Sequence, residues 1–177
     1  MRKHLLEYDD VLNQQREIIY DLRNKALLSD SIKDTINEFI EDFIFDTIGD
    51  LDFRQVKEWD WQSINQQINS NLMVNIEVGE IESLETLDEL IDYINEEALK
   101  YYKLKEDVIP SELLRKVEKF IVLKTIDEKW RNHLLGMDQL REGIGLRAYG
   151  QKNPLIEYKS ESYNFFQELM VSLRATV

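Results

Sequence analysis

The chain has 177 residues and carries 22 Lys and Arg against 35 Asp and Glu, a formal net charge of −13. The absence of cysteine excludes a disulfide framework, a zinc–thiolate site and a thiol nucleophile. No apolar run approaches the roughly 18 residues of a membrane-spanning helix, and the negative charge would repel nucleic-acid phosphates, so we expect a soluble, cytoplasmic protein with no nucleic-acid partner.

The negative charge is concentrated in the middle of the chain. Residues 1–28 are net neutral, residues 29–109 carry 6 basic and 21 acidic side chains, and residues 110–177 carry 11 basic and 9 acidic ones. This pattern predicts a separate subdomain between two segments of different character. The acidic surface either solvates that subdomain or selects partners by repelling acidic and attracting basic ones, and the sequence leaves both readings open.

Helices dominate the predicted elements, because only two prolines and six glycines punctuate the chain. Apolar residues at steps of three and four predict a first helix that ends at about Leu28. No cap precedes this helix, so we expect the chain to begin inside a longer one. Ser31 and Asp34 resemble a capping box at the start of a second helix, which ends near Gly49.

The next part of the chain, residues 49–80, is the least regular. It holds a short helical pattern, followed by an alternation of polar and apolar residues over 73–78 that predicts a short extended piece. Thr86 and Glu89 form a second capping-box pattern. The helix that follows them is predicted to run to about Val108.

The clearest helix begins at Pro110, which suits a first-turn position because its missing N–H costs nothing there. Apolar residues recur at steps of three or four from Leu113 to Leu140. We expect the helix to break at about Gly143 and a last helix to begin at Leu155. A short connection places two such helices antiparallel, so the predicted fold is all-α with a long helical hairpin near its end.

No motif for catalysis is present. The sequence lacks a phosphate-binding loop and a dinucleotide fingerprint. His4 and His133, the only histidines, lack metal-ligand spacing, and we expect His133 to be a solvated or capping residue. Asp9 and Asp10 are adjacent and cannot share a proton, although one of them can pair with a Lys or Arg of a neighbouring element. We predict no catalytic, cofactor-binding or metal-binding residue in this chain, with a small metal-dependent hydrolase as a minor alternative.

The link between the last two helices, residues 143–154, is longer than a hairpin turn requires. It contains no acidic residue and carries Tyr149 with Arg147 and Lys152 close by. A tyrosine in this setting suits contact with varied peptide surface at small entropic cost. Alternatively, Tyr149 folds back over the hairpin end and Arg147 caps helix carbonyls. Composition alone does not choose between these two readings.

Two segments of the sequence carry a family resemblance. Residues 125–162 begin Thr-Ile-Asp-Glu-Lys-Trp-Arg-Asn-His-Leu and continue with Met-Asp-Gln-Leu-Arg-Glu-Gly-Ile-Gly-Leu-Arg-Ala-Tyr-Gly-Gln-Lys-Asn-Pro. Residues 2–11 read Arg-Lys-His-Leu-Leu-Glu-Tyr-Asp-Asp-Val. The first segment closely resembles the C-terminal part of SecA, the family of bacterial ATPase motors that move preproteins through the SecYEG channel. The second resembles the end of the family's long scaffold helix. Asn153 stands where the family commonly has an acid.

The resemblance implies a three-part anatomy. Residues 1–28 correspond to the C-terminal end of the long scaffold helix, residues 29–109 to the acidic helical wing domain, and residues 110–177 to the two-helix finger of the scaffold. In that family the tip of the finger enters the cytoplasmic mouth of the channel, where an aromatic residue of the loop touches the moving polypeptide. By position, this role falls to Tyr149.

The resemblance also implies the surroundings and partners of this tip. Arg147, Gln151 and Lys152 would lie around the tyrosine and contact preprotein and channel. The partners would be unfolded preprotein, the SecYEG channel and the motor domains of the same protein, whose ATP hydrolysis the finger regulates. ATP and Mg belong to those motor domains, so this chain is not expected to be an enzyme itself.

Two expectations complete the sequence-based interpretation. The resemblance implies a cytoplasmic protein, bound peripherally at the inner face of the bacterial plasma membrane through the channel. The alternative is a stand-alone helical adaptor whose apolar stripes bind partner helices.

Overall fold

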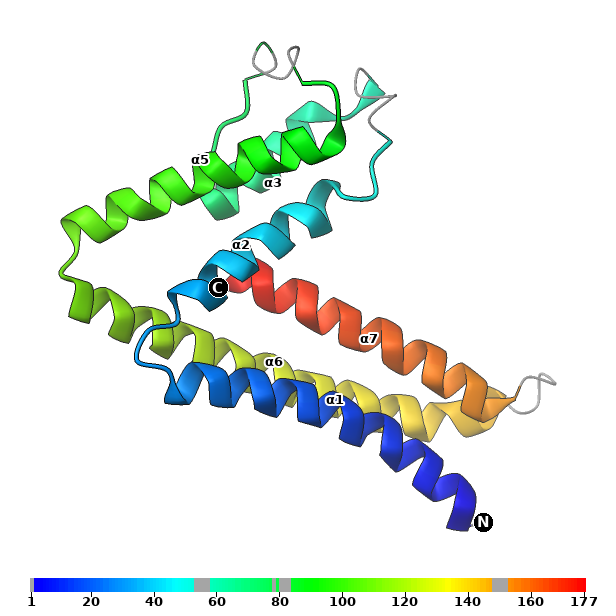
Figure 1. Ribbon diagram of the computed structural model, residues 1–177. Coiled ribbons are helices and arrows are strands. Elements are labelled where there is room, and N and C mark those ends of the chain that lie inside the picture. The colour runs from blue at the N-terminus through cyan, green and yellow to red at the C-terminus, as the bar shows by residue number, and fades with distance from the viewer. Residues whose placement is uncertain (1, 53–57, 78, 80–83, 148–152) are drawn as a thin grey trace. The chain divides into compact units, whose positions relative to one another are not determined.

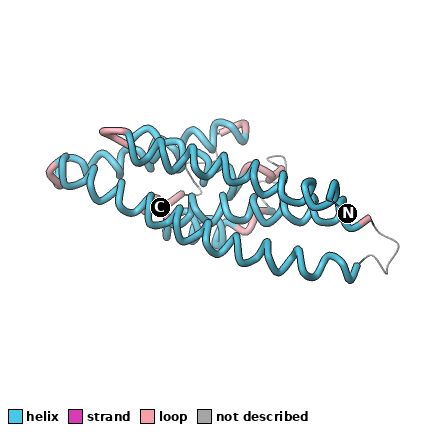
Figure 2. Tube along the Cα trace, turned by 90° about the horizontal axis from the view of Figure 1, so that it is seen from below, coloured by secondary structure: helices cyan, strands magenta, loops and turns pink. Residues whose placement is uncertain are grey.

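The computed structural model describes residues 2–52, 58–77, 79, 84–147 and 153–177. Of these, residues 2–6 and 145–147 are described only as helix. Across these ranges it contains six helices and no strand, which confirms the all-α prediction (Figure 2). None of the helices searched there combines the length and apolar character needed to cross a membrane.

The chain divides into two compact units, and each is built from separated stretches of sequence. The first unit comprises Met1–Asp30 and Lys119–Leu173. The second comprises Ser31–Glu118 and Arg174–Val177. The chain therefore leaves the first unit after its first helix, builds nearly all of the second unit, and then returns.

Three helices form the first unit: α1 (Arg2–Leu28), α6 (Ser111–Arg147) from Lys119 onward, and α7 (Pro154–Thr176) as far as Leu173. Figure 1 shows α1 in blue lying along α6, and α7 in orange and red leading back from the far end of α6. The 37 residues of α6 correspond to a length of about 55 Å at 1.5 Å per residue.

Polar contacts fix the direction of α1 relative to α6. Arg23 of α1 pairs with Asp127 of α6 at 2.8 Å, and Asp9 of α1 pairs with Arg141 of α6 at 3.1 Å. Residue numbers fall along one helix as they rise along the other, so the two helices run antiparallel. The ion pair between Asp9 and Arg141 also confirms the prediction that one of the adjacent residues Asp9 and Asp10 pairs with a Lys or Arg of a neighbouring element.

The predicted break of α6 at Gly143 is wrong, because the helix continues to Arg147. Ile144, next in sequence, is only 3% exposed and belongs to an apolar cluster with Tyr158 of α7. Burial of an isoleucine stabilises by about 1.5–3 kcal/mol, whereas a helical glycine costs about 1 kcal/mol. The burial of Ile144 therefore outweighs the cost of Gly143, and α6 continues past this glycine.

We expect Gly143→Ala to raise the free energy of unfolding by about 0.5–1 kcal/mol. A Cβ atom built at this glycine meets no atom within 4 Å apart from its chain neighbours and its own helix backbone, and its φ is not positive. Urea denaturation followed by circular dichroism measures the change. Unchanged or lowered stability would contradict the view that the glycine is merely tolerated.

The second unit contains α2 (Lys33–Ile48), α3 (Trp61–Leu72) and α5 (Leu87–Val108), together with the first two turns of α6. One apolar core joins these three helices and the segment after α3; its buried members are Phe43, Ile44, Ile48, Ile68, Val74, Ile76, Leu90, Ile94 and Ala98. The last residues of the chain return to this unit, where Arg174 pairs with Asp46 of α2 at 2.7 Å.

The two predicted capping boxes have different outcomes. At Thr86 the box is confirmed: its side chain accepts from the Glu89 N–H, and the Glu89 carboxylate accepts from the Thr86 N–H. At Ser31 the prediction is wrong, because the residue before α2 is Ile32, whose burial in the unit takes precedence over capping. The Ser31 hydroxyl instead accepts from the Lys33 N–H at 3.3 Å.

The extended piece was predicted over residues 73–78; the structure has no strand at 73–77, and residue 78 lies outside the described residues. Its alternation is nevertheless real, since Val74 and Ile76 are buried. Asn65 of α3 takes the place of a partner strand: its side-chain amide donates to the Ile76 carbonyl at 3.2 Å and accepts from the Ile76 N–H at 2.9 Å.

Candidate functional site

The predicted tip lies at the end of the α6–α7 hairpin. Tyr149, Gln151 and Lys152 fall outside the described residues, and Arg147 is described only as the last residue of α6. Their roles stay predictions. The structure describes the two helices on either side of this segment: α6 ends at Arg147, and α7 begins at Pro154.

Asn153 caps the helix that leads away from the tip. Its side-chain oxygen accepts from the Leu155 N–H at 3.0 Å, and its backbone carbonyl accepts from the Glu157 N–H at 3.1 Å. Pro154 occupies the first helical position, where a missing N–H costs nothing. Sequence reasoning missed this cap, although an Asn-Pro pair before a helical pattern was the signal for it.

An aromatic cluster closes the hairpin just behind the tip. Tyr158 of α7 is 2% exposed and packs with Met137, Leu140 and Ile144 of α6. Its ring meets that of Tyr8 of α1 edge-on, with centroids 4.7 Å apart. Burial raises the pKa of Tyr158 above its usual value, so the phenol is neutral at physiological pH. The cluster therefore ties all three helices together close to the tip segment.

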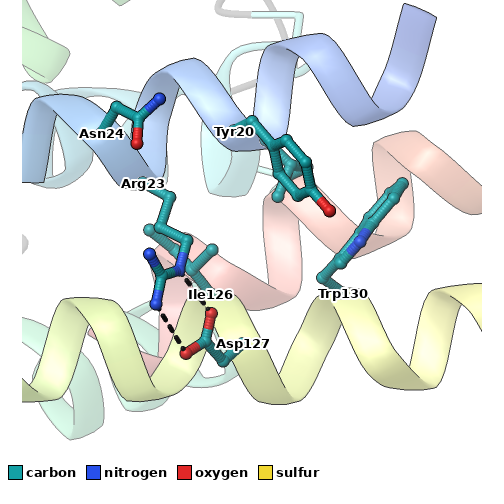
Figure 3. Close-up of a pocket in the computed structure, with 7 residues that line it drawn as sticks. Tyr20, Arg23, Asn24, Ile126, Asp127 and Trp130 are labelled. Carbon is teal, nitrogen blue, oxygen red and sulfur yellow. Dashed lines mark hydrogen bonds and ion pairs between the residues drawn. The ribbon is translucent and has the colours of Figure 1, made fainter. Parts of the chain in front are cut away.

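A groove of about 380 Å³ lies further back between α1 and α6 (Figure 3). Tyr20 of α1 lies beside Trp130 of α6, and Asn24 of α1 also belongs to the lining. The two charged side chains in its lining, Arg23 and Asp127, are joined by two hydrogen bonds of 2.8 and 3.4 Å. These two charges are paired with each other, so the lining of the groove carries no net charge.

His133 is buried, which corrects the expectation of a solvated or capping residue. It is 7% exposed, stacks on Trp130 with ring centroids 5.4 Å apart, and meets the edge of Phe166 at 5.8 Å. Its Nε2 lies 2.8 Å from the Oε1 of Gln15. Burial lowers the pKa of His133 to about 4, so the ring is neutral at physiological pH. Its position on the apolar stripe of α6 was the available signal.

The stability of the first unit should therefore depend on pH through His133. The folded state disfavours the charged ring, so the unfolded state binds more protons between pH 6.5 and about 4. The contribution of the neutral His133 ring to the free energy of unfolding is fully present above pH 6.5 and is lost as the pH falls toward 4. Its size is up to about 3 kcal/mol, at about 1.4 kcal/mol per pKa unit.

Urea titrations of the wild type and of His133→Gln between pH 4 and 7.5 measure this dependence. Glutamine does not titrate, so the difference between the two proteins isolates the histidine from the carboxylates. We expect the wild type to lose stability relative to the variant as the pH falls. A constant difference would contradict a depressed pKa.

A second polar cluster lies in the second unit and was not predicted. Arg115 of α6 donates to the hydroxyl of Tyr102 and to the carboxylate of Glu118, both at 2.7 Å, and also pairs with Glu106. The Tyr102 hydroxyl donates to Glu118 at 2.6 Å, and Lys33 pairs with Glu106 at 2.6 Å. Burial, and then the hydrogen bond to Glu118, raises the pKa of Tyr102. The spacing of three between Arg115 and Glu118 was the only local signal.

The described residues contain no group of three or more His, Asp or Glu side chains that could hold a metal ion. The buried side chains of Gln15, His133, Tyr102 and Glu118 form hydrogen bonds with other protein groups, whereas the buried side-chain oxygens of Asn37, Asn95 and Ser162 have no hydrogen-bond partner among the described residues. Together, the fold and these contacts define an all-helical architecture, in the part of the chain that the structure describes, whose first unit is built on a long antiparallel hairpin.

Comparison with known proteins identifies the family. The SecA Wing and Scaffold domain matches residues 1–177. Similar proteins include the protein translocase subunit SecA of Heliobacterium modesticaldum, 38% identical over 176 residues, and that of Prosthecochloris aestuarii, 43% identical over 172 residues. These alignments cover 98% and 96% of this chain but 21% and 16% of the relatives. The chain belongs to the SecA wing and scaffold family, and it spans about a fifth or less of the length of these relatives.

Proposed function

We propose that this chain is the part of a SecA-type protein translocase that presents a hairpin tip to unfolded preprotein. Tyr149 is the contacting aromatic residue, and Arg147, Gln151 and Lys152 supply polar and cationic groups around it. Two findings support the proposal: the family membership of the whole chain, and relatives that are named protein translocase subunits.

The structural observation that supports the proposal is the close packing of α6 and α7 next to the tip segment. Ile144 lies three residues before the end of α6 and Tyr158 four residues after the start of α7, and both are buried. The Asn153 cap holds the entry into α7. A hairpin held this firmly suits a segment that must keep its place against a moving chain.

The anatomy proposed for the chain follows the resemblance: scaffold-helix end over 1–28, wing over 29–109, and finger over 110–177. The structural division lies at 118/119, so the first two turns of α6 belong to the same compact unit as the acidic segment. The acidic segment and the base of the finger therefore share one folded body.

The remaining proposals concern the whole translocase. The tip contacts the SecYEG channel, and the finger regulates ATP hydrolysis by the motor domains, where ATP and Mg bind. The protein works in the cytoplasm and at the inner face of the bacterial plasma membrane, which it reaches peripherally through the channel. We assign no catalytic residue to the present chain.

Cross-linking tests the contact at the tip. Tyr149→Cys, placed in a cysteine-free full-length translocase, is expected to cross-link a preprotein stalled during translocation. The absence of cysteine from this chain makes the handle unique within it. Tyr163→Cys is the matched control, because Tyr163 lies on α7 and is 62% exposed. Equal labelling at the two positions, or none at Tyr149→Cys, would contradict the proposal.

A further inference from the structure

The corner between α5 and α6 buries little apolar surface on the α6 side. Among residues 111–118, the first two turns of α6, the one buried apolar side chain is Leu114, which is 7% exposed. Leu113 and Val117 are 54% and 43% exposed. The apolar core named above for the second unit contains no residue of α6. The contact of these turns with α5 therefore depends largely on hydrogen bonds and ion pairs.

Four charged side chains alternate in sign across this corner. Glu106 of α5 pairs with Lys33 of α2 at 2.6 Å and also with Arg115 of α6. Arg115 in turn pairs with Glu118 of its own helix at 2.7 Å. The Tyr102 hydroxyl of α5 donates to Glu118 and accepts from Arg115. Two side chains of α5, Tyr102 and Glu106, therefore hold the charged groups of α6.

If the first two turns of α6 leave α5, these charges separate into two complete ion pairs. Lys33 and Glu106 stay together on α2 and α5. Arg115 and Glu118 stay together on α6, because they lie three residues apart in one helix. Breaking a buried ion pair is normally costly because it leaves a charge without a partner. Here no charge loses its last partner, so the contact can open without that cost.

The backbone at the corner suits such an opening. Ile109 ends α5 in an extended conformation, with φ −99° and ψ 130°. Pro110 follows it and has no N–H with which to continue the hydrogen bonds of α5. On the other side, the N–H groups of Leu113 and Leu114 donate to the Pro110 carbonyl at 2.9 and 3.0 Å. Rotation at Ile109 can therefore change the angle between the helices without breaking the backbone hydrogen bonds of either.

We propose that the corner between α5 and α6 is a releasable joint, in which Tyr102 and Glu106 hold the first two turns of α6 and release them as one helical piece. Lys33 and Arg115 repel each other across Glu106, which favours release. The joint lies within the second unit. The inference goes beyond the proposed function and does not depend on what the hairpin tip contacts.

Thiol labelling of the whole chain tests the joint, because the chain contains no cysteine. Leu114→Cys reports opening of the corner, and Ala98→Cys, at a core position that is 3% exposed, reports unfolding of the second unit. In the Tyr102→Phe/Glu106→Gln background we expect Leu114→Cys to react at least about tenfold faster and Ala98→Cys at an unchanged rate. Phenylalanine and glutamine keep the size of the side chains, so hydrogen bonds and a charge are what the background loses.

Glu97→Gln/Tyr101→Phe is the matched control on the same helix. Glu97 pairs with Lys100 within α5, and Tyr101 is 37% exposed, so this background should leave the Leu114→Cys rate unchanged. A faster rate in the control, an unchanged rate in the test background, or equal acceleration at Ala98→Cys would overturn the proposal. If the double background does not fold, Glu106→Gln alone is read with the same probes and the same outcomes.

Lys33→Met gives a result that a merely stabilising ion pair would not give. Without the lysine, opening leaves Glu106 with no cation, and the repulsion that favours release is gone. We therefore expect Leu114→Cys to react about threefold more slowly in Lys33→Met, an effect on the scale of a partly exposed ion pair. If the pair only stabilises the unit, its loss should speed the labelling. An unchanged or faster rate would overturn the proposal.

Discussion

Arg115→Met should lower the free energy of unfolding by about 3 kcal/mol. The side chain of Glu118 is 7% exposed, and Arg115, itself 17% exposed, is the cation that neutralises it. Methionine keeps much of the apolar volume but leaves the carboxylate with the Tyr102 hydroxyl alone. Removing one partner of a buried pair costs about 3–5 kcal/mol, and the partial exposure of Arg115 places the effect at the lower end. Urea denaturation measures it.

Lys116→Met is the matched control, since Lys116 follows Arg115 in the same helix. It pairs with Glu112 at 4.0 Å, and both side chains are largely exposed, so we expect a change within about 0.5 kcal/mol. Replacing Tyr102, Arg115 and Glu118 together by Phe, Met and Leu should recover most of the lost stability, because no buried charge then remains unpaired. Similar losses for the two single methionine variants would show that burial of Glu118 is not the cause.

Tyr158→Ala is expected to destabilise the first unit by about 3–5 kcal/mol. The ring is 2% exposed and fills the space between Tyr8 of α1 and the apolar face of α6, so its removal leaves a cavity as well as losing buried area. Thermal and urea unfolding of the variant measure the loss. The position close behind the tip also predicts weaker protection of the adjacent amides of α6 in hydrogen exchange.

Tyr163→Ala provides the comparison on the same helix. The residue lies five positions further along α7 and is 62% exposed, so truncation should change stability by no more than about 0.5 kcal/mol. If both tyrosine variants lose similar stability, the cluster behind the tip is not the principal anchor of the hairpin.

The helices were largely predictable from sequence, because apolar periodicity reports which face of a helix is buried. The helix of α5 was predicted to follow the box at Thr86 and to end near Val108, and the structure confirms both ends. The errors lie where tertiary packing outweighs a local signal. Burial of Ile144 carries α6 past Gly143, and burial of Ile32 displaces the expected cap at Ser31.

The polar contacts inside the units could not be predicted in the same way. A single-helix pattern shows that Gln15 and His133 lie on apolar stripes, but it cannot show that two helices bring them 2.8 Å apart. The same holds for Arg115 of α6 and Tyr102 of α5. The tip residues were named from a family resemblance, and the structure describes their support, including the unpredicted cap at Asn153.

The first unit is built from two separated stretches of sequence, and this has a consequence for its folding during translation. The residues that pack with α1 in its unit lie beyond residue 118, so these contacts form only after residues 31–118 have been synthesised. Those residues make up all but the last four of the second unit, and their contacts are more local in sequence, which favours early folding. We therefore expect the inserted body to fold while it is being translated, and α1 to gain its contacts with α6 and α7 only when the hairpin emerges.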